Sequence, residues 1–169
     1  MAILKICTYP DPVLRKETVA ITVFDEKLVK LTEDMAETMY DAPGIGLAAP
    51  QIGESLKLVV VSTARREDSK QEYMVMANPE IVEKEESQVD EEGCLSVPEL
   101  LAMVKRYRKI KVNYQDINGE PCSMTVEDRF AVVLQHEIDH LNGILFLDHL
   151  SSLKRNLYKK KVKKWFLPR

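Results

Sequence analysis

The sequence predicts an α+β fold, with mixed, largely antiparallel sheets around a central helix that carries an HExxH motif and a further helix at the C-terminus. Two observations predict this class. Several β-branched runs follow one another between two helical segments, and Asn118-Gly119, a dipeptide typical of tight hairpins, joins the last two runs. The chain of 169 residues shows no repeat and no Ser/Gly-rich linker, so a single domain is expected.

Helices are expected on both sides of the strand region. Pro12 favours a short helix over residues 11–16. After Asp25, apolar residues recur at spacings of three and four and predict an amphipathic helix that ends before Pro43. The residues that carry this spacing are Leu28, Leu31, Met35 and Met39. The same spacing returns over residues 127–141, where Asn142-Gly143 is a typical helix stop.

Strands are expected between these two longer helices. A tight stretch of small residues, 44–51, comes first, and β-branched or alternating apolar runs follow it. These runs cover residues 57–62, 73–77, 80–84, 101–105, 109–114 and 121–126.

Charge is unevenly distributed along the chain. Lys and Arg number 24 and Asp and Glu 27, for a net charge of −3. Eight basic residues and no acidic residue follow Asp148, so residues 1–153, with 16 basic and 27 acidic residues, carry a net charge of −11. We therefore expect an acidic body, residues 1–150, and a basic C-terminal helix or tail, residues 151–169, within the same domain.

The basic segment has the marks of a last helix. Ser151 or Ser152 can cap it, and its apolar residues form an irregular face beside the lysines. These apolar residues are Leu153, Leu157, Val162, Trp165 and Phe166.

Several classes of protein are excluded by the composition. No apolar run approaches the roughly 18 residues of a membrane span, and the N-terminal residues form no secretory signal. The three cysteines, Cys7, Cys94 and Cys122, lie far apart in no disulfide pattern, which favours a reducing compartment. A cytoplasmic protein without a membrane partner is expected.

The segment His136 to His140 reads HEIDH, an HExxH motif on the helix expected over residues 127–141. Residues four apart lie on one helical face, so both imidazoles can bind one metal ion. Glu137 lies beside them and can orient a water molecule at the ion.

A catalytic site of this kind needs a third protein ligand. The metzincin pattern fails because Phe146 stands where its last histidine is required, and no Glu follows Glu137 to serve as in thermolysin-like sites. Asp148 or His149 could serve downstream. Upstream, Cys94 lies in a turn constrained by neighbouring glycine and proline, and we favour this thiolate as the third ligand.

Three segments resemble the signature motifs of bacterial peptide deformylases, GxGLAAxQ, EGCxS and QHExDH. They are Gly44 to Gln51, Glu92 to Ser96 and Gln135 to His140. Residues 9–15 also resemble the beginning of that family's sequences. The resemblance implies a hydrolase that removes the N-formyl group from the formylmethionine of nascent polypeptides and releases formate.

The resemblance also implies roles for individual residues. Cys94, His136 and His140 would bind the metal, Glu137 would be the general acid and base, and Gln51 with the backbone N–H of Leu95 would stabilise the oxyanion. Ferrous iron is the expected ion, with zinc, nickel or cobalt as substitutes. Leu101 stands where family members often carry Arg.

A methionine side chain and a peptide backbone must also be accommodated. Val132 and Val133 on the expected helix, with Ile45, offer apolar surface, and Gly44 and Gly46 allow a backbone to approach closely. We expect all five to contact substrate. By the family resemblance, residues 153–169 are further expected to bind ribosomal RNA through phosphate contacts.

Three other functions remain to be distinguished from this one. The first is an HExxH endopeptidase, which would cleave internal peptide bonds and release no formate. The second is a structural metal module closed by a fourth ligand such as Cys122. The third is an inactive homologue that only binds its target.

Overall fold

The structure is a computed structural model that describes residues 2–63 and 72–166. Within these residues the chain forms three α-helices, three short 3₁₀ helices (η) and five strands. The helical elements are η1 (Pro12–Arg15), α1 (Glu26–Asp41), η2 (Ala49–Ile52), α2 (Asp128–Leu141), η3 (Phe146–His149) and α3 (Ser152–Trp165). The strands are β1 (Gly46–Ala48), β2 (Leu58–Ser62), β3 (Tyr73–Cys94), β4 (Val97–Gln115) and β5 (Pro121–Glu127).

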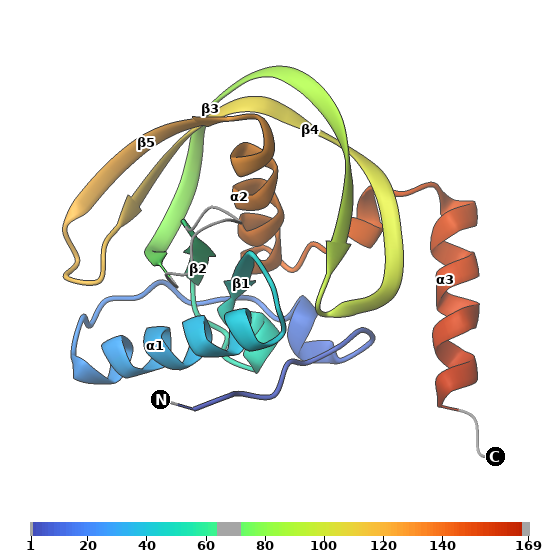
Figure 1. Cartoon of the computed structure of the whole chain (residues 1–169), viewed down its shortest axis with the longest axis horizontal. Coiled ribbons are helices and arrows are strands. Elements are labelled where there is room, and N and C mark those ends of the chain that lie inside the picture. The colour runs from blue at the N-terminus through green and yellow to red at the C-terminus, as the bar shows by residue number, and fades with distance from the viewer. Residues whose placement is uncertain (1, 64–71, 167–169) are drawn as a thin grey trace.

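The five strands form one sheet in the order β1-β2-β3-β4-β5, and every neighbouring pair is antiparallel. Figure 1 shows β3 and β4 sweeping as a long arch over α2, with α1 on the other side of β1 and β2. The α+β class and the antiparallel sheet expected from the sequence are confirmed.

Strand β2 shows how the sheet separates two helices. Val59 and Val61 pack in the core under α2, whereas Leu58 and Val60 pack in the core against α1. Successive side chains of a strand point to opposite faces, so one apolar run serves both cores. The sheet thereby lies between α1 and α2 and packs against both helices.

The lengths of β3 and β4 differ from the sequence prediction. Residues 73–77 and 80–84 were expected as separate strands, as were 101–105 and 109–114, but β3 and β4 each run continuously through both segments. The break expected at Asn78-Pro79 is a shift of register, not a loop. Asn78 adopts φ +51, and its side chain pairs with the backbone N–H and C=O of Ile21.

The helix boundaries agree with the capping signals in the sequence. Asp25 accepts a hydrogen bond from the backbone N–H of Leu28 at the start of α1. At the end of α2, Gly143 adopts φ +72, and the next residue, Ile144, donates its N–H to the carbonyl of Asp139. The first expected helix, over 11–16, is the short 3₁₀ helix η1.

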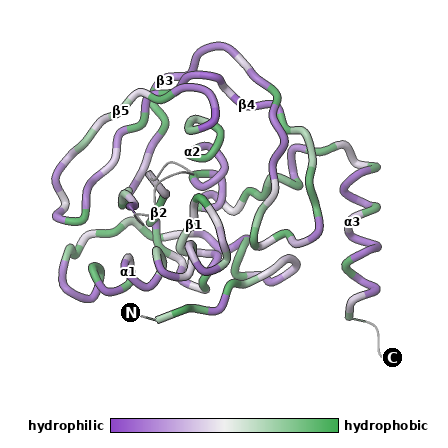
Figure 2. The backbone as a smooth tube through the Cα atoms, in the orientation of Figure 1, coloured by the Kyte–Doolittle hydropathy of each residue, from purple (hydrophilic) through white to green (hydrophobic). Residues whose placement is uncertain are grey.

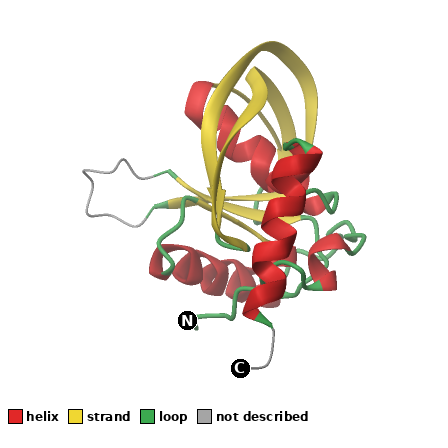
Figure 3. Cartoon of the chain, turned by 90° about the vertical axis from the view of Figure 1, so that its right-hand side faces the viewer, coloured by secondary structure: helices red, strands yellow, loops and turns green. Residues whose placement is uncertain are grey.

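Helix α3 stands along the outside of the strand arch, as Figure 3 shows. Ser151 caps it by accepting from the N–H of Lys154. The expected apolar face is only partly correct, because Val162 is buried but Leu153 and Leu157 are 69% and 58% exposed. Tyr158, which the sequence did not single out, is the other buried residue of α3.

Figure 2 shows the result as a largely hydrophilic tube along α3, interrupted by short hydrophobic segments. Residues 167–169 of the expected basic tail lie outside the described residues. Within the part of the chain that the structure describes, no helix combines the length and apolar character needed to cross a membrane.

Candidate metal centre

Helix α2 carries both histidines of the HExxH motif on one buried face. His136 and His140 are four residues apart, and their rings lie 5.0 Å from centroid to centroid. Both side chains are almost inaccessible to solvent because α2 lies under the strand arch. The motif is therefore presented inside the protein, next to the last residues of β3.

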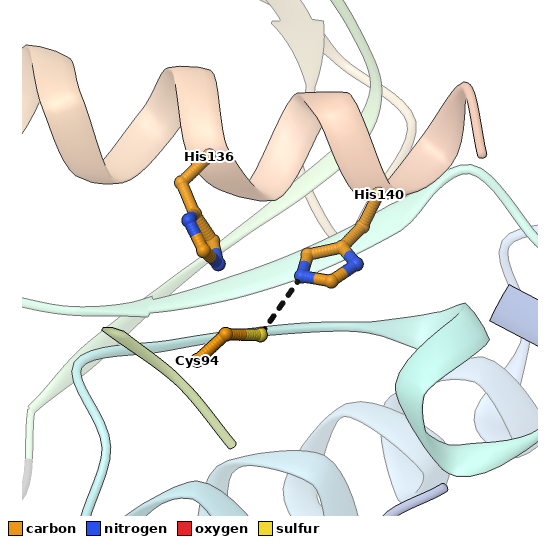
Figure 4. Close-up of side chains that lie close together, drawn as sticks. All are labelled: Cys94, His136 and His140. Carbon is orange, nitrogen blue, oxygen red and sulfur yellow. Dashed lines mark hydrogen bonds between the residues drawn. The ribbon is translucent and has the colours of Figure 1, made fainter. Parts of the chain in front are cut away.

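Cys94, the last residue of β3, completes a group of three donors. Its Sγ lies 3.3 Å from Nε2 of His140, and the donor atoms of Cys94, His136 and His140 all lie within 4.8 Å of one another. Figure 4 shows the thiol of Cys94 facing the two imidazoles from the opposite side. Thiolate and imidazole together suit zinc and the late first-row metals, so this donor set fits a transition metal ion.

The other ligands considered from the sequence lie elsewhere. Asp148 pairs with the guanidinium of Arg15, and His149 lies 2.9 Å from Asp139. Cys122, on β5, donates to the carbonyl of Glu120. In residues 2–63 and 72–166, the only group of three donors that could hold an ion is the one around Cys94.

Glu92 fixes the orientation of His136. Its Oε1 lies 2.9 Å from Nδ1 of His136, which leaves Nε2 of that ring for an ion. Arg106, on β4, grips both oxygens of Glu92 at 2.8 and 2.9 Å and also donates to Asp139 on α2. This buried cluster ties β3, β4 and α2 together directly behind the donor group.

Burial and the neighbouring charged groups shift the pKa values of Glu92 and His136 in opposite directions. Burial favours the neutral form of Glu92, but the hydrogen bonds from Arg106 and His136 outweigh it and lower the pKa of Glu92 to about 2. Burial likewise favours neutral His136, but its bonds to Cys94 and Glu92 raise the pKa of His136 to about 10. Metal binding at this ring must therefore release a proton.

His140 is the simpler of the two candidate histidine ligands. Burial and the neighbouring charge of His136 lower the pKa of His140, so its ring is neutral and ready to bind an ion. Its Nε2 lies 3.3 Å from Sγ of Cys94 and is the ring nitrogen that faces the other donors. Its Nδ1 is buried without a hydrogen-bond partner within the described residues, which is a cost to the folded chain.

Glu137 lies beside the donors, and its pKa suits proton transfer near neutral pH. Its Oε1 is 3.9 Å from Nε2 of His136, and burial raises the pKa of Glu137 to about 7. Gly46 on β1 makes room for it, since a Cβ at Gly46 would lie 2.9 Å from Cγ of Glu137. The first glycine-containing segment and the helix therefore meet at this carboxyl.

Gln51 is held so that its amide nitrogen faces the cysteine. Its Oε1 accepts the N–H of Ala48 at 2.9 Å, and its Nε2 lies 3.1 Å from Oγ of Ser96 and 3.6 Å from Sγ of Cys94. Leu95 lies next to Cys94 in the turn between β3 and β4. All three sequence motifs therefore converge at this centre.

A cleft of about 700 Å³ opens beside these groups. Cys94, His136 and Glu137 line it, and so does Leu101, which is 68% exposed. Every residue expected to contact substrate lines this cleft. These residues are Gly44, Ile45, Gly46, Val132 and Val133.

Sequence reasoning missed the supporting cluster of Glu92, Arg106 and Asp139. Glu92 and Asp139 are part of the recognised motifs, but nothing in their spacing indicates a partner, and Arg106 lies in no motif. Burial was the one available signal. An Arg at a core-facing position in the alternating pattern of a strand needs carboxylate partners, which would have indicated that Arg106 has some.

An HExxH helix with a cysteine donor at the end of a cleft defines a class, the metal-dependent hydrolases. A family model for polypeptide deformylases matches residues 3–156. A peptide deformylase of Syntrophobacter fumaroxidans is 49% identical over 164 residues, which are 97% of this chain and 96% of that protein. The chain belongs to the polypeptide deformylase family.

Solved structures agree with this assignment. A peptide deformylase from Legionella pneumophila has a TM-score of 0.89 at 48% identity, covering 97% of this chain and 95% of that one. Peptide deformylase from Ehrlichia chaffeensis in complex with actinonin has a TM-score of 0.91 at 38% identity, covering 99% and 100%. The family predicted from the three motifs is confirmed, as is its activity, hydrolytic removal of the N-formyl group from nascent polypeptides.

Proposed function

We propose that Cys94, His136 and His140 bind the divalent metal ion with which this chain hydrolyses the formyl group of N-terminal formylmethionine. The single observation that carries this assignment is the convergence of one thiol and two imidazoles within 4.8 Å at the end of a cleft. When bound, the ion would polarise the formyl carbonyl and lower the pKa of water beside it.

Glu137 is the general acid and base in this proposal. Its carboxylate takes a proton from the attacking water and passes it to the nitrogen of the departing amine, which is a poor leaving group without that proton. A pKa of about 7 supports both transfers at neutral pH, because the group can accept and release a proton with little cost.

Gln51 and the backbone N–H of Leu95 stabilise the oxyanion. Negative charge develops on the formyl oxygen as water attacks, and fixed donors lower the energy of that charge. The bond from the N–H of Ala48 to Oε1 of Gln51 supports this role, since it leaves the donor nitrogen directed towards Cys94. Loss of one such donor costs about 10²- to 10³-fold in rate.

The methionine side chain is bound by Val132, Val133 and Ile45, and the peptide backbone passes Gly44 and Gly46. Ile45 is half exposed in the cleft, whereas both valines are buried beside it. An apolar pocket of this kind gains about 25 cal/mol for each Å² of apolar surface that the substrate buries.

Ferrous iron is the proposed ion, and zinc, nickel or cobalt are substitutes. A thiolate with two imidazoles binds all of these metals. A thiolate ligand on ferrous iron also leaves the site open to oxidation, so purification in air is expected to reduce activity.

The basic segment 153–169 is proposed to bind ribosomal RNA in the cytoplasm, where formylated chains emerge. Lys159, Lys160, Lys163 and Lys164 are exposed on α3, which supports phosphate contacts. We propose that 1–150 and 151–169 form one domain, and burial of Tyr158 and Val162 against the body supports this.

Anaerobic purification, metal analysis and an assay of formate release from formyl-Met-Ala-Ser test the proposal. The variant Glu137→Ala is expected to retain the metal and lose about 10²- to 10⁴-fold in kcat. Glu83→Ala, which removes an exposed carboxyl of β3, is the matched control with unchanged activity. Full activity of Glu137→Ala would disprove the assigned role, and cleavage of internal peptide bonds without formate would indicate an endopeptidase.

A further inference from the structure

One wall of the cleft is a bulge in the strand ladder. Glu92 pairs with Ala102 and Cys94 pairs with Val97, so the single residue Gly93 faces the four residues 98–101 of β4. The segment Pro98–Leu101 therefore leaves the regular register just after the pair of Cys94 and Val97, which the turn Leu95-Ser96 joins.

This bulge forms part of the wall of the cleft. Glu99, Leu100 and Leu101 line the same cleft as Cys94, His136 and Glu137. Glu99 also adopts φ +61, a conformation that a residue with a side chain rarely adopts unless its surroundings hold it. The wall therefore needs support that the strand ladder does not supply.

Helix α3 supplies that support. The hydroxyl of Tyr158 donates to the carbonyl of Pro98 at 2.8 Å, and Nζ of Lys161 donates to the carbonyl of Glu99 at 3.3 Å. Tyr158 is 3% exposed and packs in one core cluster with Val97 and, at its edge, Leu100. Two successive carbonyls of the bulge are thus held by side chains three residues apart on α3.

Neither residue lies in the part of the chain that the family model matches, which ends at 156. We propose that Tyr158 and Lys161 are positioning residues, which hold the Pro98–Leu101 wall in the shape that binds the peptide beyond its formylmethionine. The proposal rests on the cleft being the substrate site.

The position of the Pro98–Leu101 wall in the cleft determines whether Tyr158 and Lys161 affect KM or kcat. Leu101 is 68% exposed, whereas Glu137, in the same cleft, is 4% exposed. A wall that shifts at this exposed position binds the residues after methionine less tightly and leaves the donor group in place. The effect is therefore expected in KM for longer peptides, with kcat preserved.

Steady-state kinetics with two substrates test this inference. Formyl-Met-Ala-Ser has two residues after the methionine that can contact the Pro98–Leu101 wall, whereas formyl-methionine amide has none. Tyr158→Phe, which removes only the hydroxyl, is expected to raise KM for the tripeptide about 2- to 10-fold, as for the loss of one hydrogen bond. KM for the amide and kcat for both substrates are expected to stay within error.

Two matched controls separate positioning from general destabilisation. Tyr114→Phe removes a phenol hydroxyl near Cys122, at the far end of β4, and is expected to leave both KM values unchanged. Lys161→Ala is expected to reproduce the selective rise in KM, whereas Lys160→Ala, with the same loss of charge on α3, is not. Because Lys161 is exposed, its substitution also tests the proposal if Tyr158→Phe fails to fold.

The remaining outcomes overturn the inference. An equal rise in KM for both substrates, or a lower melting temperature with unchanged KM, would make α3 a purely structural support. Failure of the proposed function looks different, because the wild-type enzyme would then release no formate from either substrate.

Discussion

A single missing methyl group at Gly46 makes room for the proposed acid and base. The ideal Cβ position at Gly46 lies 2.9 Å from Cγ and 3.0 Å from Cδ of Glu137, closer than atoms of this kind pack. Glu137 cannot move away freely, because it is buried on α2 beside the histidines. Glycine is therefore needed at position 46 because of the space that Glu137 occupies, and not because of the backbone conformation of Gly46.

Gly46→Ala is therefore expected to displace the Glu137 carboxyl and lower kcat by about 10²-fold, the cost of misplacing a reacting group by about 1 Å. Formate release measures the effect, and metal content with far-UV circular dichroism shows whether the site and fold persist. An alanine variant with wild-type kcat would show that the carboxyl has room that the structure does not indicate.

Glu92 orients His136, one of the proposed metal ligands. Its substitution by Gln keeps the shape but removes the charge that pairs with Arg106 and orients the ring. We expect Glu92→Gln to weaken metal affinity about 10- to 100-fold, measured by competition with a chelator. The adjacent Glu91→Gln is the control, since Glu91 is exposed and the metal affinity of this variant should match the wild type.

The same carboxylate determines part of the acid stability. The pKa of Glu92 is lowered from 4.5 to about 2 in the folded chain, so its contribution is fully present above pH 4.5 and is lost as pH falls towards 2. Glu92→Gln is expected to be less stable than wild type at neutral pH, and the difference should narrow in acid. Urea unfolding at several pH values measures it; parallel pH profiles for the two proteins would contradict the assignment.

At the scale of elements, capping fixes where α1 begins. The Oδ1 of Asp25 lies 3.1 Å from the N–H of Leu28, which would otherwise lack a partner in the first turn. Asp25→Ala is expected to cost about 1 kcal/mol of the free energy of unfolding. Asp25→Asn retains a capping oxygen and should lose much less, so equal losses in thermal unfolding would argue against a capping role.

The long strands of the arch also act as elements. β3 and β4 pair over most of their length and pass above α2, with shifts of register at Ala77/Glu80, Ile81/Glu83 and Glu92/Cys94. The last shift places Cys94 at the end of the arch and produces the cleft wall supported by α3. This last irregularity, unlike the other two, lies where the proposed chemistry takes place, and bulges are common near active sites.

At the scale of the whole molecule, charge is divided between an acidic body and α3. Residues 1–153 carry a net charge of −11, whereas eight basic residues follow Asp148 without an acidic one. The described lysines of α3 lie on its exposed surface, apart from the hydrogen bond of Lys161 to Glu99. This separation gives the molecule a surface suited to a polyanion.

Neutralising that surface is expected to weaken binding to purified ribosomes and to flatten its dependence on salt, by roughly 0.7–0.9 in log–log slope for each phosphate that is no longer neutralised. The variant replaces four lysines of α3 by Gln and keeps Lys161: Lys159, Lys160, Lys163 and Lys164. A control replaces four lysines of the body: Lys16, Lys27, Lys30 and Lys84. Binding that is insensitive to salt, or unchanged in a chain truncated at Ser152, would remove the proposal.

Local patterns in the sequence were sufficient for the helices, the hairpin at Asn118-Gly119 and the HExxH donors. Each of these depends on residues within a few positions of one another, so spacing and capping carry the information. Cys94 could be favoured as a ligand for the same reason, because glycine and proline lie near it in the sequence. The sequence also left Asp148 and His149 as alternatives, and in the structure these two residues interact with Arg15 and Asp139.

Contacts between distant residues could not be read in this way. The continuity of β3 through Asn78-Pro79, the grip of Arg106 on Glu92, and the bond from Tyr158 to Pro98 each depend on packing and register across the fold. Burial makes an unpaired charge or carbonyl costly, so such groups must find partners, but the partner is set by which strands and helices come together. The residues proposed for the chemistry thus lie in short motifs that the sequence shows. The contacts that hold them in place form only when distant segments pack together in the folded chain.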